Sequence, residues 1–134
     1  MEKPKNRILL GCVADDFTGA SDAASFLRNA GLRTLLMNEI QKDFPVPEQT
    51  DAVVIALKSR TEATDVAVHS TLEAIKWLEN QGTEKFYFKY CSTFDSTKKG
   101  NIGPVADAIM EYLGETCTIL CPALPVNGRI VRSG

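Results

Sequence analysis

The chain alternates between short apolar runs and longer segments in which apolar residues recur every three or four positions. Short apolar runs bounded by polar or turn residues are typical of strands, whereas the three-and-four spacing places apolar side chains on one face of a helix. Strands that alternate with helices indicate βαβ units and a mostly parallel sheet. The sequence therefore predicts a Rossmann-like α/β fold in three layers, with helices on both faces of the sheet.

The apolar runs predict five strands along the chain. They are expected at residues 8–14, 33–38, 51–57, 85–89 and 116–121. The first is almost continuously apolar, as expected of a strand that is covered on both faces. Between the last two strands, residues 103–113 are expected to form an amphipathic helix, with a proline in its first turn.

Two further helices are expected in the first half of the chain. One covers residues 18–29, carries a stripe of alanines that would let it pack close to the sheet, and stops at Gly31. The other begins near Thr61 or Thr64, either of which can cap it, and ends at Gly82.

Composition narrows the class of protein. The 134 residues are 44% hydrophobic and 24% charged, with a formal net charge of −2, which is typical of one globular domain. Without a cluster of Lys and Arg, nucleic acid and anionic membranes are disfavoured as partners. No apolar run approaches the roughly 20 residues that a membrane-spanning helix needs. We expect residues 1–134 to form one cytoplasmic domain that binds a small molecule, and a homodimer is left open.

The cysteines and the single histidine offer little chemistry. Four cysteines in a chain without an export signal are typical of reduced thiols. On one strand, Cys117 and Cys121 would lie about 13 Å apart, beyond the roughly 7 Å limit of a disulfide. Cys12 lies within the first apolar run and is expected in the core. His69 lies in the middle of a helix, without cysteines or carboxylates that would complete a metal or nucleophile site, so we expect no metal site.

Polar residues follow four of the five predicted strands. In open α/β sheets, ligands bind beyond the carboxyl ends of the strands. If the strands are parallel, the four groups share one edge. Oppositely charged side chains interleaved with hydroxyls suit a polyhydroxylated anionic ligand. The candidates are Asp15, Asp16 and Thr18 after the first strand, Arg60 after the third, Lys89, Ser92 and Asp95 after the fourth, and Asn127 after the fifth.

The doublet of Asp15 and Asp16 directly follows the first strand. One carboxylate can act as a general base or hydroxyl acceptor, and the other as a helix cap. A capping aspartate beside a solvated one explains the same doublet, and spacing alone does not decide between these interpretations. Thr18 and Gly19 would allow a ligand to approach the backbone at the helix start, although Gly19 can also be a packing choice.

The remaining candidates also have two interpretations each. Arg60 can clamp a carboxylate in bidentate fashion and Lys89 can act as a point charge, but each alone is also typical of a surface charge. The run CSTFDST at residues 91–97 is rich in hydroxyls and suits hydroxyl or phosphate binding, or else forms a solvated turn. Asn127 precedes a glycine, and tight-turn geometry explains that pair without a ligand.

Three ordered motifs carry a resemblance to a known family. They are ADDFTGA at residues 14–20, KYCSTFDST at 89–97 followed by GNIGP at 100–104, and CPALPVNGR at 121–129. Together they resemble the four-carbon acid sugar kinases, and most closely the 3-oxo-tetronate kinase branch. The motifs are spread over most of the chain, which makes the match far more specific than any single motif.

The resemblance implies a two-domain enzyme that phosphorylates the terminal hydroxyl of a four-carbon sugar acid. Its N-terminal domain would hold the acid, and its C-terminal domain would hold ATP and Mg²⁺. The present sequence resembles only the first domain, and it contains neither GxxxxGK[ST] nor GxGxxG after a strand. We therefore expect an incomplete substrate-binding part that is inactive by itself.

The resemblance also implies roles for individual residues. Asp15 and Asp16 would lie in the sugar-acid pocket, with Asp16 accepting the hydroxyl proton. The side chains expected to hold the carboxylate and hydroxyls of the acid are Arg60, Lys89, Ser92 and Asp95.

Two alternatives to a kinase domain remain. One is a non-catalytic module that binds a sugar acid. The other is a receiver-like phosphoacceptor domain, because an acidic pair after the first strand of a parallel sheet also marks that class. A receiver needs an acceptor aspartate at the end of the third strand, where this chain has Lys58, Ser59 and Arg60.

Overall fold

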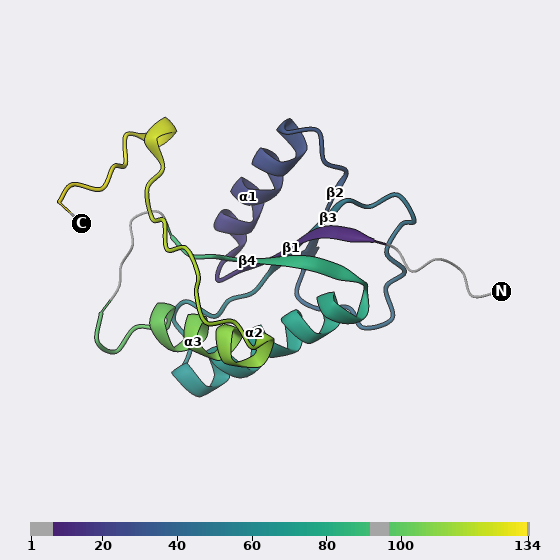
Figure 1. Ribbon diagram of the computed structural model, residues 1–134. Coiled ribbons are helices and arrows are strands. Elements are labelled where there is room, and N and C mark those ends of the chain that lie inside the picture. The colour runs from purple at the N-terminus through teal and green to yellow at the C-terminus, as the bar shows by residue number, and fades with distance from the viewer. Residues whose placement is uncertain (1–6, 92–96, 134) are drawn as a thin grey trace.

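The computed structural model describes residues 7–91 and 97–133, and Figure 1 shows their arrangement. One sheet is formed by the strands β1 (Ile8–Ala14), β2 (Thr34–Asn38), β3 (Ala52–Ala56) and β4 (Thr83–Lys89). The helices are α1 (Phe17–Asn29), α2 (Thr64–Asn80), α3 (Ile102–Leu113) and the short 3-10 helix η1 (Pro125–Asn127).

The four strands are all parallel and lie in the order β2-β3-β1-β4. Ala14 at the end of β1 pairs in register with Ala56 of β3 and with Lys89 of β4. The carboxyl ends of these three strands are therefore level with one another. Whatever follows each of them in the sequence begins at the same edge of the sheet.

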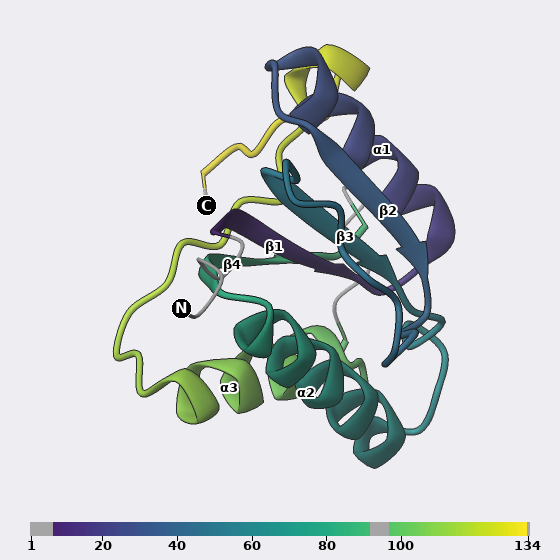
Figure 2. The ribbon, with the colours of Figure 1, turned by 90° about the vertical axis from the view of Figure 1, so that its right-hand side faces the viewer.

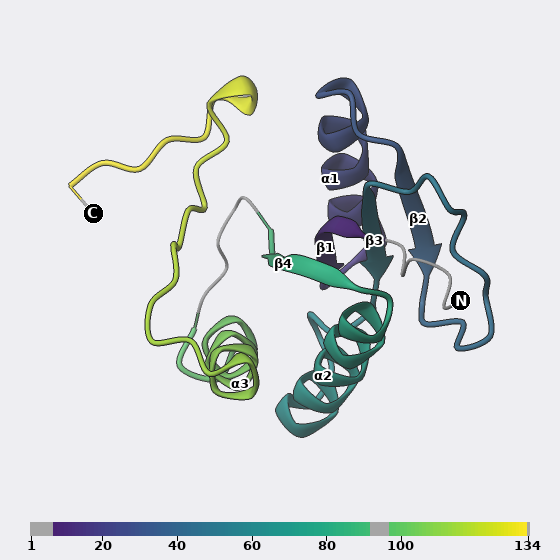
Figure 3. The same ribbon diagram turned by 45° about the vertical axis from the view of Figure 1, so that its right-hand side comes forward.

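The helices cover both faces of the sheet. α1 lies on one face, while α2 and α3 lie together on the other (Figures 1 and 3). β1 leads through α1 to β2, and β3 leads through α2 to β4 in the opposite direction across the sheet. Because right-handed crossovers in opposite directions place their helices on opposite faces, this topology requires three layers. The predicted fold class is confirmed.

The face under α1 is lined by small side chains. Ala20 and Ala23 of α1 are buried against Cys12 and Ala14 of β1. The predicted alanine stripe therefore does bring the helix close to the sheet. Burial raises the pKa of the Cys12 thiol to about 12, because the thiolate would have to leave water.

The opposite face carries the larger core. Its buried side chains include Val53 and Ile55 of β3, Ile75 and Leu78 of α2, and Ile109 of α3. Val54 and Ala56 of β3 belong to the core under α1. Successive residues of β3 therefore face opposite sides of the sheet, as the two-residue period of a strand requires. Figure 2 shows α2 and α3 side by side below the sheet.

The prediction of a fifth strand at residues 116–121 is wrong. This segment has no regular secondary structure, and Ile119 and Leu120 are 90% and 56% exposed. A strand exists only when its backbone pairs with a neighbour, and an apolar β-branched run is not sufficient by itself. Cys117 and Cys121 are both free, which confirms that they are not a disulfide pair, although the strand geometry used to argue it does not apply.

The predicted cap of the second helix is also wrong. α2 begins at Thr64, so its N-cap is Ala63, which has no side chain able to accept a hydrogen bond. Thr64 instead donates from Oγ1 to Asn101 Oδ1 at 2.9 Å. The hydroxyl that the pattern assigned to α2 is used for a contact between elements. His69 is exposed on α2, as expected.

Among residues 7–91 and 97–133, no helix combines the length and the apolar character needed to cross a membrane.

Candidate functional site

Charged side chains lie close together at the carboxyl ends of β1, β3 and β4, which end level with one another. Asp15 and Asp16 follow β1, Arg60 follows β3, and Lys89 is the last residue of β4. β1 and β3 are neighbours whose following segments lead to helices on opposite faces. In open α/β sheets, such a reversal is the place where ligands bind.

Asp15 is fixed to both neighbouring strands. Its backbone N–H donates to the carbonyl of Lys89 at 3.1 Å, and its carbonyl accepts from the N–H of Arg60 at 3.2 Å. Its side chain is only 6% exposed. A buried carboxylate is costly unless it is paired, so its environment must supply a cation.

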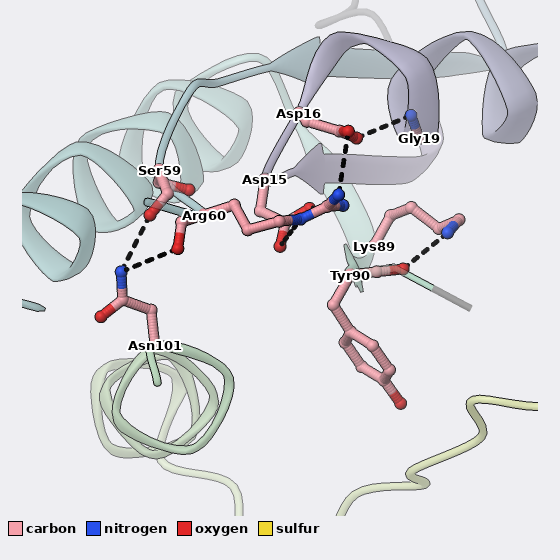
Figure 4. A network of polar contacts seen from close by, with 8 residues as sticks. All are labelled: Asp15, Asp16, Gly19, Ser59, Arg60, Lys89, Tyr90 and Asn101. Atoms are coloured by element: carbon pink, nitrogen blue, oxygen red, sulfur yellow. Dashed lines mark hydrogen bonds and ion pairs between the residues drawn. The ribbon is translucent and has the colours of Figure 1, made fainter. Parts of the chain in front are cut away.

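Arg60 supplies that cation and reaches both aspartates (Figure 4). Its Nε and Nη2 donate to the two oxygens of Asp15, at 3.2 and 2.7 Å. Its Nη1 lies 3.1 Å from Oδ2 of Asp16. The pKa of the Arg60 guanidinium is raised above its ordinary value, chiefly because it donates hydrogen bonds to Asp15. The planar fork of arginine suits this arrangement, and a lysine would not reproduce it.

Asp16 combines a structural contact with exposure. It is the N-cap of α1, and its Oδ1 accepts from the N–H of Gly19 at 2.7 Å. Its side chain is 32% exposed, far more than that of Asp15. Glycine is needed at position 19, since a Cβ there would lie 2.8 Å from Asp16 Oδ1. Asp16 is therefore the helix cap that both interpretations of the doublet include. Its neighbour Asp15 is buried and not solvated, and a role as general base stays a prediction.

Lys89 extends over the start of α1. Its Nζ donates to the carbonyl of Tyr90 at 2.6 Å, and it lies 3.8 Å from the position that a Cβ of Gly19 would take. Within the part of the chain that the structure describes, Lys89 forms no ion pair. Its ammonium group therefore lies near the start of α1, the helix that Asp16 caps.

Ser59 and Asn101 also belong to the site. Ser59 follows the third strand and Asn101 lies in the GNIGP motif, but the sequence predicted no specific contact for either. Ser59 is 2% exposed, and its carbonyl accepts from Asn101 Nδ2 at 2.9 Å. Both line a cavity of about 50 Å³ behind the Asp15–Arg60 pair, which is room for a few water molecules. A lone asparagine before a predicted helix indicates a cap, so no sequence signal distinguishes this role.

The other predicted residues are not all brought to this point. Thr18 is exposed in the first turn of α1, next to Asp16. Ser92 and Asp95 lie outside the described residues. Asn127 ends η1, which stays level with the C-terminal end of α1 in all three ribbon views, away from the helix start. The shared edge therefore gathers the groups that follow β1, β3 and β4.

The cluster joins two carboxylates to two cations, so its formal charges cancel. The carboxylate of Asp16 is 32% exposed, and Lys89 forms no ion pair among the residues that the structure describes. In residues 7–91 and 97–133, no group of three His, Cys, Asp or Glu side chains is placed to hold a metal ion.

Comparison with known proteins shows the same fold and related sequences. The model of a family described as a sugar-binding N-terminal domain matches residues 10–134. A 3-oxo-tetronate kinase from Pectobacterium atrosepticum is 61% identical over 128 residues, which is 95% of this chain and 30% of that protein. A 3-oxo-tetronate kinase from Escherichia coli is 53% identical over 127 residues, 95% of this chain and 32% of that protein. The chain thus spans about 30% of the length of these curated relatives.

Solved structures agree with these matches. A crystal structure of a Haemophilus influenzae protein superposes with a TM-score of 0.84 at 54% identity, covering 88% of this chain and 28% of that one. A domain of unknown function from Bordetella bronchiseptica, described as a domain-swapped dimer with bound citrate, superposes with a TM-score of 0.81 at 31% identity. That match covers 93% of this chain and 31% of the other.

Proposed function

Because the chain belongs to the family of sugar-binding N-terminal domains, we propose that it is the acid-binding part of an ATP-dependent kinase. The substrate is a four-carbon sugar acid such as a 3-oxo-tetronate, and the group phosphorylated is its terminal hydroxyl. Relatives of this chain are named 3-oxo-tetronate kinases. The observation that carries the proposal is the meeting of Asp15, Asp16, Arg60 and Lys89 at the level ends of three parallel strands.

In this proposal the carboxylate of the acid binds at the start of α1. Lys89 supplies a positive charge there. Arg60 is already engaged by both aspartates, so its task is to hold them in place. One solved relative is described with bound citrate, which is itself a hydroxy acid.

Asp16 is the proton acceptor in this proposal. Its Oδ1 is tied to the N–H of Gly19, which fixes the direction of the carboxylate, while Oδ2 faces Arg60. During transfer, the hydroxyl oxygen of the acid forms a bond to the γ-phosphorus, its proton moves to Oδ2, and ADP leaves. Phosphoryl transfer depends mostly on positioning and on neutralising phosphate charge. Asp15 is too buried to reach the substrate and serves to anchor Arg60.

ATP with Mg²⁺ supplies the phosphoryl group in this proposal. Among residues 7–91 and 97–133, no group of three carboxylate, cysteine or histidine side chains could hold a metal ion, and the sequence contains neither GxxxxGK[ST] nor GxGxxG after a strand. Every step assigned to this chain therefore concerns the acid and its hydroxyl. A cytoplasmic location and a homodimer belong to the same proposal, since ATP is available in the cytoplasm and one relative is described as a dimer.

The receiver-like alternative is disfavoured by topology. Receivers have the strand order 2-1-3-4-5, whereas here β3 separates β2 from β1. The end of β3 is followed by Ser59 and Arg60, and Arg60 is occupied by the aspartates. A module that binds a sugar acid without transferring phosphate remains the second candidate.

Phosphoryl transfer is best measured in a chimera in which this chain replaces the matching part of the Pectobacterium relative. The chimera is expected to phosphorylate a 3-oxo-tetronate. Asp16→Asn is expected to lower kcat by roughly 10²- to 10⁴-fold, the usual contribution of a general base. Asparagine still caps a helix, so folding should be retained. Asp107→Asn, on the exposed face of α3, is the matched control and should leave kcat unchanged.

Calorimetry on the 134-residue chain separates the two candidates. Binding of a four-carbon acid by the chain, together with a chimera that turns over, supports the kinase proposal. Binding without turnover by the chimera favours the binding module. A loss of only a few-fold in kcat for Asp16→Asn would remove Asp16 from the role of base.

A further inference from the structure

The side chain of Asn101 is used in an unusual way. It stands at the N-cap of α3, with φ −91° and ψ −14°, yet it makes no capping hydrogen bond to that helix. Asparagine is among the best N-cap residues, and a cap typically contributes about 1 kcal/mol. Its amide is therefore held by other contacts, which Figure 4 shows in part.

Those contacts are made to the segment between β3 and α2 and to Thr64, the first residue of α2. Asn101 Nδ2 donates to the carbonyl of Ser59 at 2.9 Å and to that of Glu62 at 2.8 Å, with a longer contact of 3.5 Å to the carbonyl of Arg60. Asn101 Oδ1 accepts from Thr64 Oγ1 at 2.9 Å. A reversed amide would point its oxygen at carbonyl oxygens, so the contacts fix its orientation.

The segment so held is the one that carries Arg60. On its other side, the N–H of Arg60 donates to the carbonyl of Asp15. Between the segment and α3 lies the cavity of about 50 Å³ lined by Ser59 and Asn101. The packing of α3 against α2 places the helix as a whole, and the amide of Asn101 adds a directed link from its start to the segment across this cavity.

We propose that Asn101 is a positioning residue for Arg60. Its amide holds the segment between β3 and α2 in the position at which the Arg60 guanidinium contacts both Asp15 and Asp16. That contact keeps the Asp16 carboxylate oriented toward the ligand. This inference rests on the proposed function in so far as it concerns affinity for a four-carbon acid. Asn101 itself touches no substrate.

Asn101→Ser is the variant that separates positioning from helix capping. Serine caps a helix about as well as asparagine, but it is too short to reach the carbonyls of Ser59 and Glu62. We expect the urea midpoint to fall, because the hydrogen bonds to the carbonyls of Ser59 and Glu62 are lost, and the dissociation constant of a four-carbon acid to rise at least tenfold. Asn80→Ser, at the exposed end of α2, is the matched control and should change neither.

Two further variants grade the effect. Asn101→Asp places a carboxylate oxygen against the same carbonyls and should weaken binding more than Asn101→Ser. Thr64→Val removes only the hydroxyl that orients the amide, so it should weaken binding less. If Asn101→Ser binds the acid as well as the unaltered chain does, the proposal is wrong.

A measurement without ligand keeps the two proposals apart. The Nε–H of Arg60, held by Asp15, should give a slowly exchanging proton signal in a ¹H–¹⁵N spectrum of the unaltered chain. We expect exchange of that signal to accelerate at least tenfold in Asn101→Ser and to stay unchanged in Asn80→Ser. Unchanged exchange in Asn101→Ser overturns the positioning role. Accelerated exchange in a chain that binds no four-carbon acid supports the positioning role and overturns the proposed function alone.

Discussion

Neighbouring aspartates with the same side chain have different tasks in this molecule. Asp15 is buried and joined by two hydrogen bonds to Arg60, whereas Asp16 caps α1 and stays about one third exposed. The difference arises because successive residues leaving a strand point in opposite directions. The Asp15 carboxylate therefore points toward Arg60, and the Asp16 carboxylate points toward the start of α1.

The orientation of Asp16 depends on the missing side chain of Gly19. In Gly19→Ala, the new Cβ would lie 2.8 Å from Asp16 Oδ1, so the carboxylate must turn and lose its hydrogen bond. The lost cap costs about 1 kcal/mol, and alanine regains up to about 1 kcal/mol in helix propensity. Urea unfolding should therefore show a net change below about 1 kcal/mol, while calorimetry shows at least tenfold weaker binding of a four-carbon acid.

Gly103→Ala provides the control for that variant. Position 103 lies in the first turn of α3, where a Cβ would meet nothing within 4 Å. Stability should rise by up to about 1 kcal/mol, and affinity for the acid should not change. Undiminished affinity in Gly19→Ala would show that the direction of the Asp16 carboxylate does not matter for binding.

At the scale of elements, α2 begins without a side-chain cap. Ala63 has φ −56° and ψ 143°, which is an extended conformation suited to a capping serine. Ala63→Ser should stabilise the fold by about 1 kcal/mol, because its hydroxyl can accept from an N–H of the first turn. The expected result is a higher midpoint in urea unfolding with an unchanged slope.

Thr61→Ala tests the cap that the sequence pattern suggested. Thr61 lies outside α2 and is exposed, so its replacement should change stability by less than about 0.5 kcal/mol. A cost near 1 kcal/mol for Thr61→Ala, with no gain from Ala63→Ser, would mean that the helix begins earlier and that Thr61 caps it.

The elements that the sequence predicted well are those whose burial is visible in their own residues. The apolar period of α2 and the apolar run of β3 specify which face is covered, and the structure confirms both. Residues 116–121 have a similar composition but no neighbouring strand. Whether residues 116–121 pair depends on how far from β4 the end of α3 places them. Local composition does not specify that distance.

The position of the candidate site could be predicted from the sequence, but the contacts among its side chains could not. Asp15, Asp16, Arg60 and Lys89 were placed by the rule that ligands meet strand ends. That Arg60 is engaged by the aspartates depends on side-chain geometry across two strand ends 45 positions apart, which no spacing reveals. The contacts of Asn101 were missed because nothing in the GNIGP motif indicates that its amide meets carbonyls about 40 positions away.

At the scale of the whole molecule, the sheet separates two cores of different character. The core under α1 is made of small residues around Cys12, and the core under α2 is made of larger ones. Cys12 is fully buried in β1, between β3 and β4. Its thiol can reach water only when the sheet and α1 separate, so it reports on the unfolding of the entire domain.

The buried thiol predicts how stability depends on pH. Its pKa is about 12 in the folded chain against an ordinary value of 9.0, because burial disfavours the thiolate. A group whose pKa is raised by folding contributes its full stability below the lower value, and loses it as pH rises toward the higher one. From pH 8 to pH 10, the free energy of unfolding should therefore fall by about 1.4 kcal/mol more in the unaltered chain than in Cys12→Ala.

Urea unfolding of both chains under reducing conditions measures that difference, and subtracting one from the other cancels the titration of the remaining groups. The small cavity left by Cys12→Ala lowers stability equally at both pH values, so it does not enter the comparison. Cys117→Ala removes an exposed thiol and should show the same pH dependence as the unaltered chain. Equal slopes for Cys12→Ala and the unaltered chain would mean that water reaches β1 in the folded state, and that α1 does not seal this face of the sheet.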